Sequence, residues 1–361
     1  MLYAQITGWG RCLPPARLTN RDIMEVMDTS EEWILERTGI ETRRISHVMS
    51  ADLAHVASER ALACAGVQAD KIDMIAFATT TADEIVPNTA SLLQGKLGAT
   101  GAACFDLNAA CTGFIYAFQM VSDMIRTGTI KSALVVGSER LSSLMNWKRR
   151  ESAILFGDGA AALVLQASTQ ESGFFQGKMG CIENTRELLA IPDYGLHAIA
   201  QHRPLDITID FHGREIFKNA VNEMANACTE VLERSGLDLK DVDLIVPHQA
   251  NARIVEALAK KLNADPEKIV ITLDRYANTS TSSIPIALCE AIEQGRVRPG
   301  ATILMTAFGA GLTWGALLLK WGERIAPLGE SSIELPATDK TGLELIKEAI
   351  RLRDKVWHDK K

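Results

Sequence analysis

Cys111 stands in the segment DLNAACTGF, where small residues precede it and Thr112 and Gly113 follow it. This composition suits a tight turn that begins a helix. A thiol at such a turn faces backbone N–H groups and the positive end of the helix dipole, which lowers a thiol pKa and favours the nucleophilic thiolate. We therefore expect Cys111 to be a candidate nucleophile, although a small buried core residue is the commoner role of a free cysteine.

Two polar residues elsewhere in the chain could assist a nucleophile. His248 opens the segment HQAN directly after an apolar strand, and Asn278 lies in YANTSTSS. Taken singly, His248 could be a surface or core histidine, and Asn278 could be a turn former or a helix cap. A cysteine, a histidine and an asparagine at three separate turns would together form a nucleophile with two polar helpers.

A glycine-rich segment, FGAGLTWG at residues 308–315, follows the last strong strand pattern. Its glycines would let backbone N–H groups approach a ligand closely, so the loop could complete an oxyanion hole. Neither this segment nor GWGRCLPPA near Gly8 has the GxGxxG spacing and following acidic residue of a dinucleotide site. We therefore expect neither NAD nor FAD.

The elements that would position these residues are duplicated along the chain. In two places an amphipathic helix ends at a glycine, Gly66 or Gly236, seven residues before an aspartate that opens a buried strand. The two aspartates, Asp73 and Asp243, have the same separation of 170 residues as the two glycines. Helix, loop and strand therefore occur twice, as expected of an internal repeat.

A second pair of matching segments contains the candidate site residues. Cys111 precedes Gly128 by 17 residues, and Asn278 precedes Gly295 by the same 17 residues. Each segment reads as a turn of small residues, an apolar helix, a glycine and a strand. Cys111 and Asn278 thus occupy equivalent places in two halves, and a pseudo-twofold arrangement would bring their turns together at a shared site.

Apolar runs that read as strands alternate with helical patterns throughout the chain. This alternation predicts an α/β fold. We divide the chain into an N-terminal half at residues 1–170, which contains Cys111, and a C-terminal half at residues 171–322, which contains His248 and Asn278. The predicted strands are Ile72–Thr79, Ser132–Gly137, Ala160–Leu165, Asp243–Pro247, Ile269–Thr272 and Thr302–Ala307.

Residues 323–361 differ from the two halves. They begin with a stretch that contains Pro327, Gly329 and Pro336, which predicts a linker. After it, Leu343, Ile346, Ile350 and Trp357 fall near helical spacing among alternating charges. We expect an amphipathic C-terminal helix docked on the body of the protein, with a partner-binding helix as the alternative.

Composition excludes several classes of protein. The 361 residues are 47% hydrophobic and 23% charged, which allows a large core, and the formal net charge of −7 argues against a surface built for nucleic acid. No leader pattern and no run of 18 uncharged apolar residues is present, so we expect a cytoplasmic protein without a membrane span. The seven cysteines are scattered without CxxC pairs, which predicts reduced thiols and no metal site.

Six ordered motifs together resemble the β-ketoacyl-acyl-carrier-protein synthase III (KAS III) family of the thiolase superfamily. The resemblance extends from about Leu2 to Trp321. It implies a thiolase-like fold in which two pseudo-symmetric α/β halves form layers in the order α-β-α-β-α. The motifs are TSEEWILERTGIETRR at 29–44, AACTGF at 109–114, ILFGDGAAA at 154–162, VPHQANARI at 246–254, YANTS at 276–280 and FGAGLTWG.

The resemblance also implies roles for individual residues. Cys111 would be the acylated nucleophile, with His248 and Asn278 as its catalytic partners. The backbone N–H groups of Cys111 and Ala310 would form the oxyanion hole. The positions that match coenzyme A-binding residues of the family are Trp33, Arg37, Arg150 and Asn251, and those that match contacts with the acidic carrier protein are Lys218 and Arg253.

The reaction that the resemblance implies is an acyl-CoA-primed, decarboxylative Claisen condensation with a malonyl thioester, expected on acyl carrier protein. It would give a β-ketoacyl product and initiate fatty acid biosynthesis, in a homodimer that needs no metal or redox cofactor. Related enzymes use the same three residues for head-to-head condensation, other starter units or ester formation. An acyltransferase or thioesterase that forms acyl-Cys111 without condensing, and a scaffold that only binds coenzyme A, are further alternatives.

This sequence departs from the family pattern in three places. Val86 precedes Pro87 where the family often has a bulky phenylalanine beside the acyl tunnel, so we expect Val86 to border a tunnel that admits longer chains. The segment NWKRRE, which includes Trp147 and Arg150, is more basic than usual, and this predicts a change in how the nucleotide is held. The tail after Trp321 extends beyond the usual end of the family.

Overall fold

The computed structural model describes residues 2–202 and 209–358. Two sheets form the centre of the molecule, and each mixes parallel and antiparallel neighbours. The first has the strand order β1-β7-β6-β4-β5 and the second has the order β11-β12-β13-β8. Their strands are β1 (Tyr3–Cys12), β4 (Met74–Ala78), β5 (Ala103–Leu107), β6 (Ser132–Arg140), β7 (Asp158–Ser168), β8 (Gly173–Cys181), β11 (Leu244–Pro247), β12 (Thr302–Gly309) and β13 (Thr313–Lys320).

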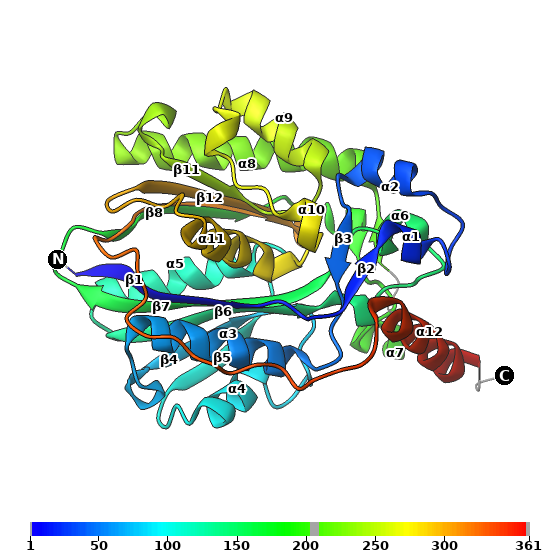
Figure 1. Ribbon diagram of the computed structural model, residues 1–361. Helices are drawn as coiled ribbons and strands as arrows, with labels where there is room; N and C mark the ends of the chain where they lie inside the picture. Colours follow the sequence, from blue (N-terminus) through cyan, green and yellow to red (C-terminus); the bar gives the residue numbers. More distant parts are fainter. Residues whose placement is uncertain (1, 203–208, 359–361) are drawn as a thin grey trace.

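Helices cover both sheets and also separate them, which gives the order α-β-α-β-α from one side of the molecule to the other (Figure 1). Helices α8 (Gly213–Ser235) and α9 (Ala252–Leu262) form one outer layer. Helices α3 (Ser50–Ala65) and α4 (Thr89–Leu97) form the other. Between the sheets lie α5 (Gly113–Arg126) and α11 (Ser283–Glu293), so the layered thiolase-like fold expected from the sequence is confirmed.

The short strands β2 and β3 and the helices α1, α2, α6 and α10 lie together at one end of the two sheets (Figure 1). Two small ribbons, β2 with β3 and β9 with β10, are antiparallel pairs. Their bounds, with those of the remaining helices, are β2 (Arg17–Thr19), β3 (Thr42–Arg44), β9 (Leu189–Ala190), β10 (Asp210–Phe211), α1 (Asn20–Ile23), α2 (Glu31–Thr38), α6 (Arg150–Ala153), α7 (Leu196–Ala200), α10 (Leu273–Tyr276) and α12 (Gly342–His358). The single-turn 3₁₀ helices are η1 (Ala69–Lys71), η2 (Leu141–Ser143), η3 (Arg186–Leu188), η4 (Leu239–Asp241), η5 (Pro266–Lys268), η6 (Ser280–Ser282) and η7 (Ala310–Leu312).

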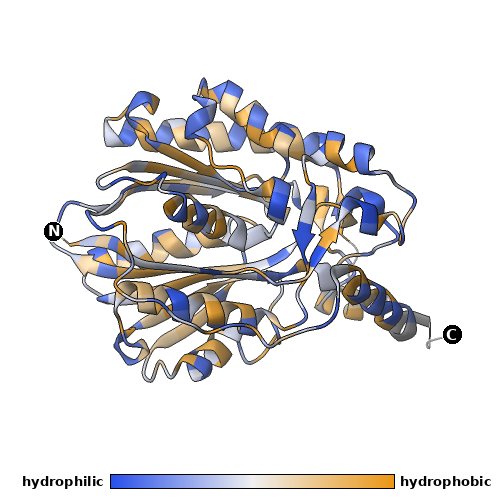
Figure 2. Ribbon diagram, viewed as in Figure 1, coloured by the Kyte–Doolittle hydropathy of each residue, from blue (hydrophilic) through white to orange (hydrophobic). Residues whose placement is uncertain are grey.

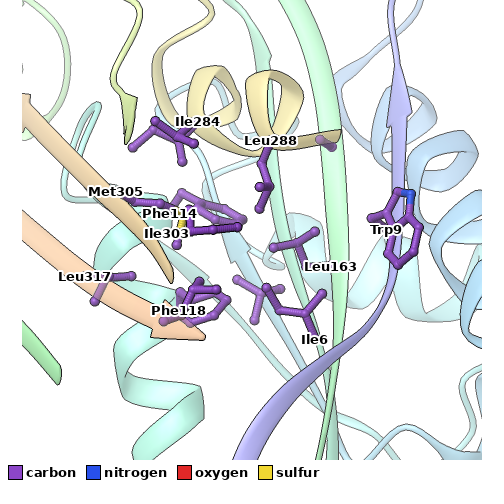
Figure 3. Close-up of a cluster of buried hydrophobic side chains, with 14 of the residues drawn as sticks. Ile6, Trp9, Phe114, Phe118, Leu163, Ile284, Leu288, Ile303, Met305 and Leu317 are labelled. Carbon is purple, nitrogen blue, oxygen red and sulfur yellow. The ribbon is translucent and has the colours of Figure 1, made fainter. Parts of the chain in front are cut away.

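The main core lies between the sheets, around the two central helices. Figure 3 shows Phe114 and Phe118 of α5 beside Ile284 and Leu288 of α11, and these four side chains are at most 1% exposed. Figure 2 shows the contrast with the outer helices, which carry hydrophilic residues on their solvent side. Every residue of α11 from Ser283 to Ile292 is buried, as expected of a helix that is covered on two sides by sheets.

The duplicated loops have the same geometry in both halves. Gly66 and Gly236 both end their helices with φ of 66°. Asp73 then accepts a hydrogen bond from the backbone N–H of Ser132, at 3.0 Å, and Asp243 accepts one from the N–H of Thr302, at 2.9 Å. A carboxylate at each strand start thus fixes the neighbouring parallel strand, which confirms the internal repeat.

Five of the six predicted strands are present, and the prediction for Ile269–Thr272 is wrong. Ile269 forms only an isolated bridge with Ile245. The side chain of Gln249 accepts the N–H groups of Thr272 and Leu273, so the chain begins α10 there instead of pairing as a strand.

The tail after β13 lies along the first half of the chain, beneath α3, and ends in α12 (Figure 1). Arg60 of α3 pairs with Glu334, and the N–H of Leu328 donates to the carbonyl of Cys64. Leu345 and Ile346 of α12 are 9% and 1% exposed, so the predicted docked helix is confirmed. The side chain of Trp357 lies outside the described part of the structure. Within the described residues, no helix is both long enough and apolar enough to cross a membrane.

Candidate active site

A pocket of about 410 Å³ contains all three candidate catalytic residues, Cys111, His248 and Asn278. Its wall also includes Arg37 and Arg253, which are exposed, whereas His248 and Asn278 are only 2% and 6% exposed. The pocket therefore leads from a charged mouth to a buried end. Apolar side chains line the part between, among them Ile154, Leu189, Ile216, Met224 and Phe308.

Cys111 lies at the predicted turn between β5 and α5. The preceding residue, Ala110, has a φ of 49°, and α5 begins two residues after the cysteine at Gly113. Asn278 has the matching place in the second half, because Ala277 before it has a φ of 58°. A non-glycine residue in this region is strained, so two such residues at equivalent positions indicate that both turns are held by the surrounding structure.

The electrostatic surroundings of Cys111 differ from the expectation. Protein encloses the sulfur closely, although the residue stays partly accessible from the pocket, and this desolvation raises the pKa of the thiol to about 11. A hydrogen bond with Ser280 lowers the pKa, whereas the charge of Glu139 raises it further. The expected lowering of the pKa by the helix dipole is therefore wrong, because burial outweighs it. Cys111 rests as a protonated thiol at neutral pH.

His248 follows β11 and is fixed on both sides. Its backbone N–H donates to the carbonyl of Thr306, and its Nδ1 atom lies 2.6 Å from the hydroxyl of Ser283. Burial lowers the pKa of His248 to about 3, so the imidazole is neutral at physiological pH. A neutral imidazole whose Nδ1 is occupied can present Nε2 to a ligand in the pocket.

Asn278 is joined to the first half of the chain by its backbone. Its N–H donates to the carbonyl of Leu155, and its own carbonyl accepts from the N–H of Gly157, both at 3.0 Å. The side-chain oxygen accepts from the N–H of Ser280 at 2.7 Å. Because this oxygen already has a donor, the amide nitrogen is the part of Asn278 that remains to donate to a ligand.

The glycine-rich loop lies directly against the turn of Cys111. A Cβ atom on Gly309 would come within 2.8 Å of the backbone nitrogen of Cys111, so only glycine fits there. The hydroxyl of Thr112 donates to that of Thr313, at 2.8 Å, which joins the two segments. Ala310 follows Gly309 at the start of η7. The two backbone N–H groups expected to form an oxyanion hole therefore belong to adjoining segments.

Sequence reasoning missed Glu139, a fully buried carboxylate behind the site. It accepts hydrogen bonds from the N–H of Thr80 at 3.1 Å and from the hydroxyl of Thr81 at 2.6 Å, both in the first half. It also accepts from the hydroxyl of Thr281 in the second half, at 3.0 Å. Burial raises the pKa of Glu139, and these donors oppose that rise. An acidic residue at the end of the apolar run LVVGSE was the signal available in the sequence.

The residues expected to bind coenzyme A lie together at the mouth. The guanidinium carbons of Arg37 and Arg150 lie 4.9 and 4.8 Å from the ring centre of Trp33. Asn251 caps α9 by accepting the N–H of Arg253, and its amide donates to the carbonyl of Arg37. Aromatic and guanidinium planes are suited to stacking on a nucleobase, and the arginines also offer charge to phosphates.

The two residues expected to contact a carrier protein lie on separate outer helices. Arg253 is exposed on α9, lines the pocket and donates to the carbonyl of Glu36. Lys218 is exposed on α8, next to the pocket-lining Phe217. Both are exposed cations, and Arg253 is the one that lines the pocket.

Val86 does not line the pocket of this chain. Its side chain is 84% exposed on a surface loop, beside Ile85, which is exposed to the same extent. Within one chain, Val86 is therefore not part of the pocket wall, and its place beside an acyl tunnel stays a prediction.

No group of three or more histidine, cysteine, aspartate or glutamate side chains within residues 2–202 and 209–358 is arranged to hold a metal ion. The groups that the described part of the pocket offers to a substrate are a thiol, a neutral imidazole, a side-chain amide and backbone N–H groups.

Two family models match this chain. The one described as 3-oxoacyl-[acyl-carrier-protein (ACP)] synthase III matches residues 105–181, and its C-terminal counterpart matches residues 232–321. A Vibrio cholerae protein named beta-ketoacyl-[acyl-carrier-protein] synthase III 2 is 49% identical over 353 residues, which is 96% of each chain. A Symbiobacterium thermophilum protein named beta-ketoacyl-[acyl-carrier-protein] synthase III is 46% identical and covers 88% of this chain and 98% of its own length.

Solved structures give the same result. The crystal structure of 3-oxoacyl-[acyl-carrier-protein] synthase III from Aquifex aeolicus superposes with a TM-score of 0.84 at 43% identity, over 88% of this chain and 100% of its own. The Pseudomonas aeruginosa structure has a TM-score of 0.83 at 37% identity, over 89% of this chain and 99% of its own. OleA from Xanthomonas campestris, at 24% identity and a TM-score of 0.79, shares the fold.

Proposed function

Because the chain belongs to the β-ketoacyl-[acyl-carrier-protein] synthase III family, we propose that its pocket condenses an acyl group from acyl-CoA with a malonyl thioester on acyl carrier protein. The product is a β-ketoacyl thioester, and the reaction initiates fatty acid biosynthesis. The observation that carries the assignment of residues is the convergence of Cys111, His248 and Asn278 in one buried pocket.

In the first half-reaction, Cys111 takes the acyl group. Its sulfur attacks the thioester carbonyl of acyl-CoA, and the N–H groups of Cys111 and Ala310 stabilise the tetrahedral oxyanion. Because the thiol pKa is about 11, the proton must leave Cys111 as the C–S bond forms, and it ends on the sulfur of the departing coenzyme A. The products are acyl-Cys111 and free coenzyme A.

In the second half-reaction, a malonyl thioester replaces coenzyme A. Its thioester carbonyl accepts hydrogen bonds from His248 Nε2–H and from the amide of Asn278. Loss of CO₂ leaves an enolate whose charge these donors hold in a site of low dielectric constant. The enolate carbon attacks acyl-Cys111, and the Cys111 thiolate leaves and regains a proton from water. The neutral state of His248 supports this role, because a donor that stays uncharged does not need a counter-ion.

The mouth of the pocket would hold the carriers of the two substrates. We assign the adenine of coenzyme A to the stack of Trp33 and Arg150, its phosphates to Arg37, and the pantetheine arm to the side of Asn251. Lys218 and Arg253 would meet the acidic surface of the carrier protein, since both are exposed cations on the outer helices α8 and α9 and Arg253 lines the pocket.

We place the enzyme in the cytoplasm as a homodimer without a metal or redox cofactor. Strand β5 is the outer strand of its sheet, and only one of its edges is paired. The loop with Ile85 and Val86 lies on that side, because Asn88 donates to the carbonyl of Cys104 in β5. An unpaired strand edge next to exposed apolar side chains supports pairing with a second copy of the chain.

Intact-mass analysis after incubation with a panel of acyl-CoAs tests the first half-reaction, because the added mass identifies both acylation and the preferred starter. Release of CO₂ from malonyl thioester by the acylated enzyme tests the second. Acylation without decarboxylation would assign the chain to the acyltransferases or thioesterases, and no acylation by any acyl-CoA would reject the proposal.

A further inference from the structure

Two segments that set this sequence apart from the family pattern lie against each other in the structure. One is NWKRRE at residues 146–151, and the other is the tail, which lies beyond the family model that ends at residue 321. Trp147 is 2% exposed and shares one buried cluster with Leu345 and Ile346 of α12. Lys148 forms an ion pair with Asp354 of α12, at 2.9 Å. The unusual tryptophan and the unusual helix therefore belong to one buried cluster.

The segment that α12 covers also carries one half of the nucleotide stack. Arg150 follows Lys148 by two residues and lies 4.8 Å from the ring centre of Trp33. It also donates to the carbonyl of Asp28, in the segment before α2. We call Trp33 and Arg150 the clamp.

Helix α12 contacts the other half of the clamp as well. Lys347 pairs with Glu25 at 2.7 Å, and Glu25 belongs to the segment between α1 and α2 that leads to Trp33. Trp33 itself packs against the buried cluster that contains Ile346. One helix therefore contacts both sides of the clamp, through exposed ion pairs with Lys148 on one side and Glu25 on the other and through the buried cluster against which Trp33 packs.

The clamp must widen to admit a nucleobase. Carbon atoms in contact are separated by about 3.5 Å, so a ring stacked between two flat groups needs about 7 Å between them. The guanidinium carbon of Arg150 lies only 4.8 Å from the ring centre of Trp33, which is too close for a nucleobase to fit between them. Because α12 is fixed to both sides, its packing sets how far the clamp opens and how well it is ordered before the ligand arrives.

We propose that α12 is a brace for the clamp and thereby determines the affinity of the enzyme for the nucleotide end of coenzyme A thioesters. This inference depends on the proposed function for the identity of the ligand. Ile346 is the positioning residue at its centre, since it is 1% exposed and belongs to the same buried cluster as Trp147. Ile346 does not line the pocket itself, but its cluster also contains the pocket-lining Ile154, Leu155 and Phe156, so an effect confined to the substrate that has a nucleotide is what identifies the clamp as the route.

The test compares a substrate with a nucleotide and one without. Ile346→Ala should raise KM for acyl-CoA at least fivefold and leave KM for acyl-pantetheine, which lacks the nucleotide, within twofold of the wild type. The kcat values for both substrates should stay within twofold. Ile346→Val should shift KM for acyl-CoA in the same direction by a smaller factor. A merely structural role would change both substrates equally.

Two control variants separate the brace from general destabilisation. Leu352→Ala, on the same helix but 59% exposed, should leave all constants unchanged. Leu97→Ala removes a side chain that is 9% exposed on α4, in a different buried cluster, and should lower the melting temperature without a selective effect on acyl-CoA. Equal KM changes for the two substrates in Ile346→Ala, or an unchanged KM for acyl-CoA in the folded variant, would overturn the proposal.

Calorimetry with adenosine 3′,5′-bisphosphate, the nucleotide part of coenzyme A without its thioester, tests the brace without any reaction. The wild type should bind it, and Ile346→Ala should bind it at least fivefold more weakly. Binding of equal strength rejects the brace, as does the absence of binding to the wild type. If the wild type binds the nucleotide but is never acylated, the proposed function is rejected. The comparison of nucleotide binding by the wild type and Ile346→Ala then still decides whether α12 is a brace.

Discussion

The Nδ1 atom of His248 lies 2.6 Å from the hydroxyl oxygen of Ser283, the first residue of α11. The N–H of Gln249 approaches the same oxygen at 3.4 Å, so the hydroxyl can accept from Gln249 while it donates to His248. In that arrangement Nδ1 is an acceptor and Nε2 carries the proton. Ser283 thus favours the tautomer that donates to a thioester carbonyl.

Ser283→Ala should therefore slow condensation about tenfold and leave acylation of Cys111 nearly unchanged. The loss of one hydrogen bond to a buried group costs about 1–1.5 kcal/mol, and 1.36 kcal/mol corresponds to a factor of ten in rate. Ser283→Thr, which keeps the hydroxyl, is the matched control. Single-turnover measurements separate the two half-reactions, and an equal loss in both would contradict the role of Ser283.

One equivalent of acyl-CoA should acylate Cys111 and no other cysteine. Cys64 and Cys289 are 3% and 0% exposed and do not line the pocket, whereas Cys111 does. Peptide mapping after a short incubation identifies the acylated residue. The mechanism would be wrong if the acyl group were found on Cys64 or Cys289, or if Cys111→Ala kept full activity.

Mutation of the two donors should separate the half-reactions. His248→Ala and Asn278→Ala should still accept the acyl group but lose condensation by about 10²-fold or more, which is the size of effect seen when one oxyanion donor is removed. Intact mass measures acylation, and CO₂ release measures condensation. Equal losses in both steps would show that these residues do not act on the malonyl thioester.

The reactivity of Cys111 should depend steeply on pH. Its thiol pKa is about 11, so below that pH the thiolate fraction, and with it the rate of alkylation by iodoacetamide, should rise about tenfold for each pH unit. Glu139→Gln removes a negative charge that disfavours the thiolate, which should lower the thiol pKa and speed alkylation at pH 8. Glu139→Asp keeps the charge and should react like the wild type; identical rates for the Gln and Asp variants would argue against an electrostatic effect.

The duplicated elements could be predicted because their signals are local. A glycine that ends a helix and an aspartate that opens a strand act within a few residues, so Gly66, Gly236, Asp73 and Asp243 were identified from spacing alone. The segment at 269–272 was wrongly predicted as a strand, because the contact that begins a helix there comes from the distant side chain of Gln249.

The parts of the site that escaped prediction depend on contacts across the fold. Glu139 and Thr281 are 142 residues apart in sequence, and nothing near either residue indicates the partner. The pKa of Cys111 was predicted in the wrong direction because a helix dipole is visible in a sequence whereas desolvation depends on the assembled pocket. Val86 was placed on the pocket by resemblance, yet the structure exposes it at the surface.

The contact between Glu139 and Thr281 has a consequence for the construction of chimeric enzymes. In a chimera with a crossover near residue 170, one parent would supply Glu139 and the other would supply Thr281. Gly137 would come from the same parent as Glu139, and a Cβ atom there would lie within 2.7 Å of the Thr281 carbonyl oxygen. In a library that recombines halves of related synthases, Gly137, Glu139 and Thr281 should therefore all come from the same parent. Chimeras of parents that differ at any of the three would have a mismatched contact between the two halves, close to Cys111.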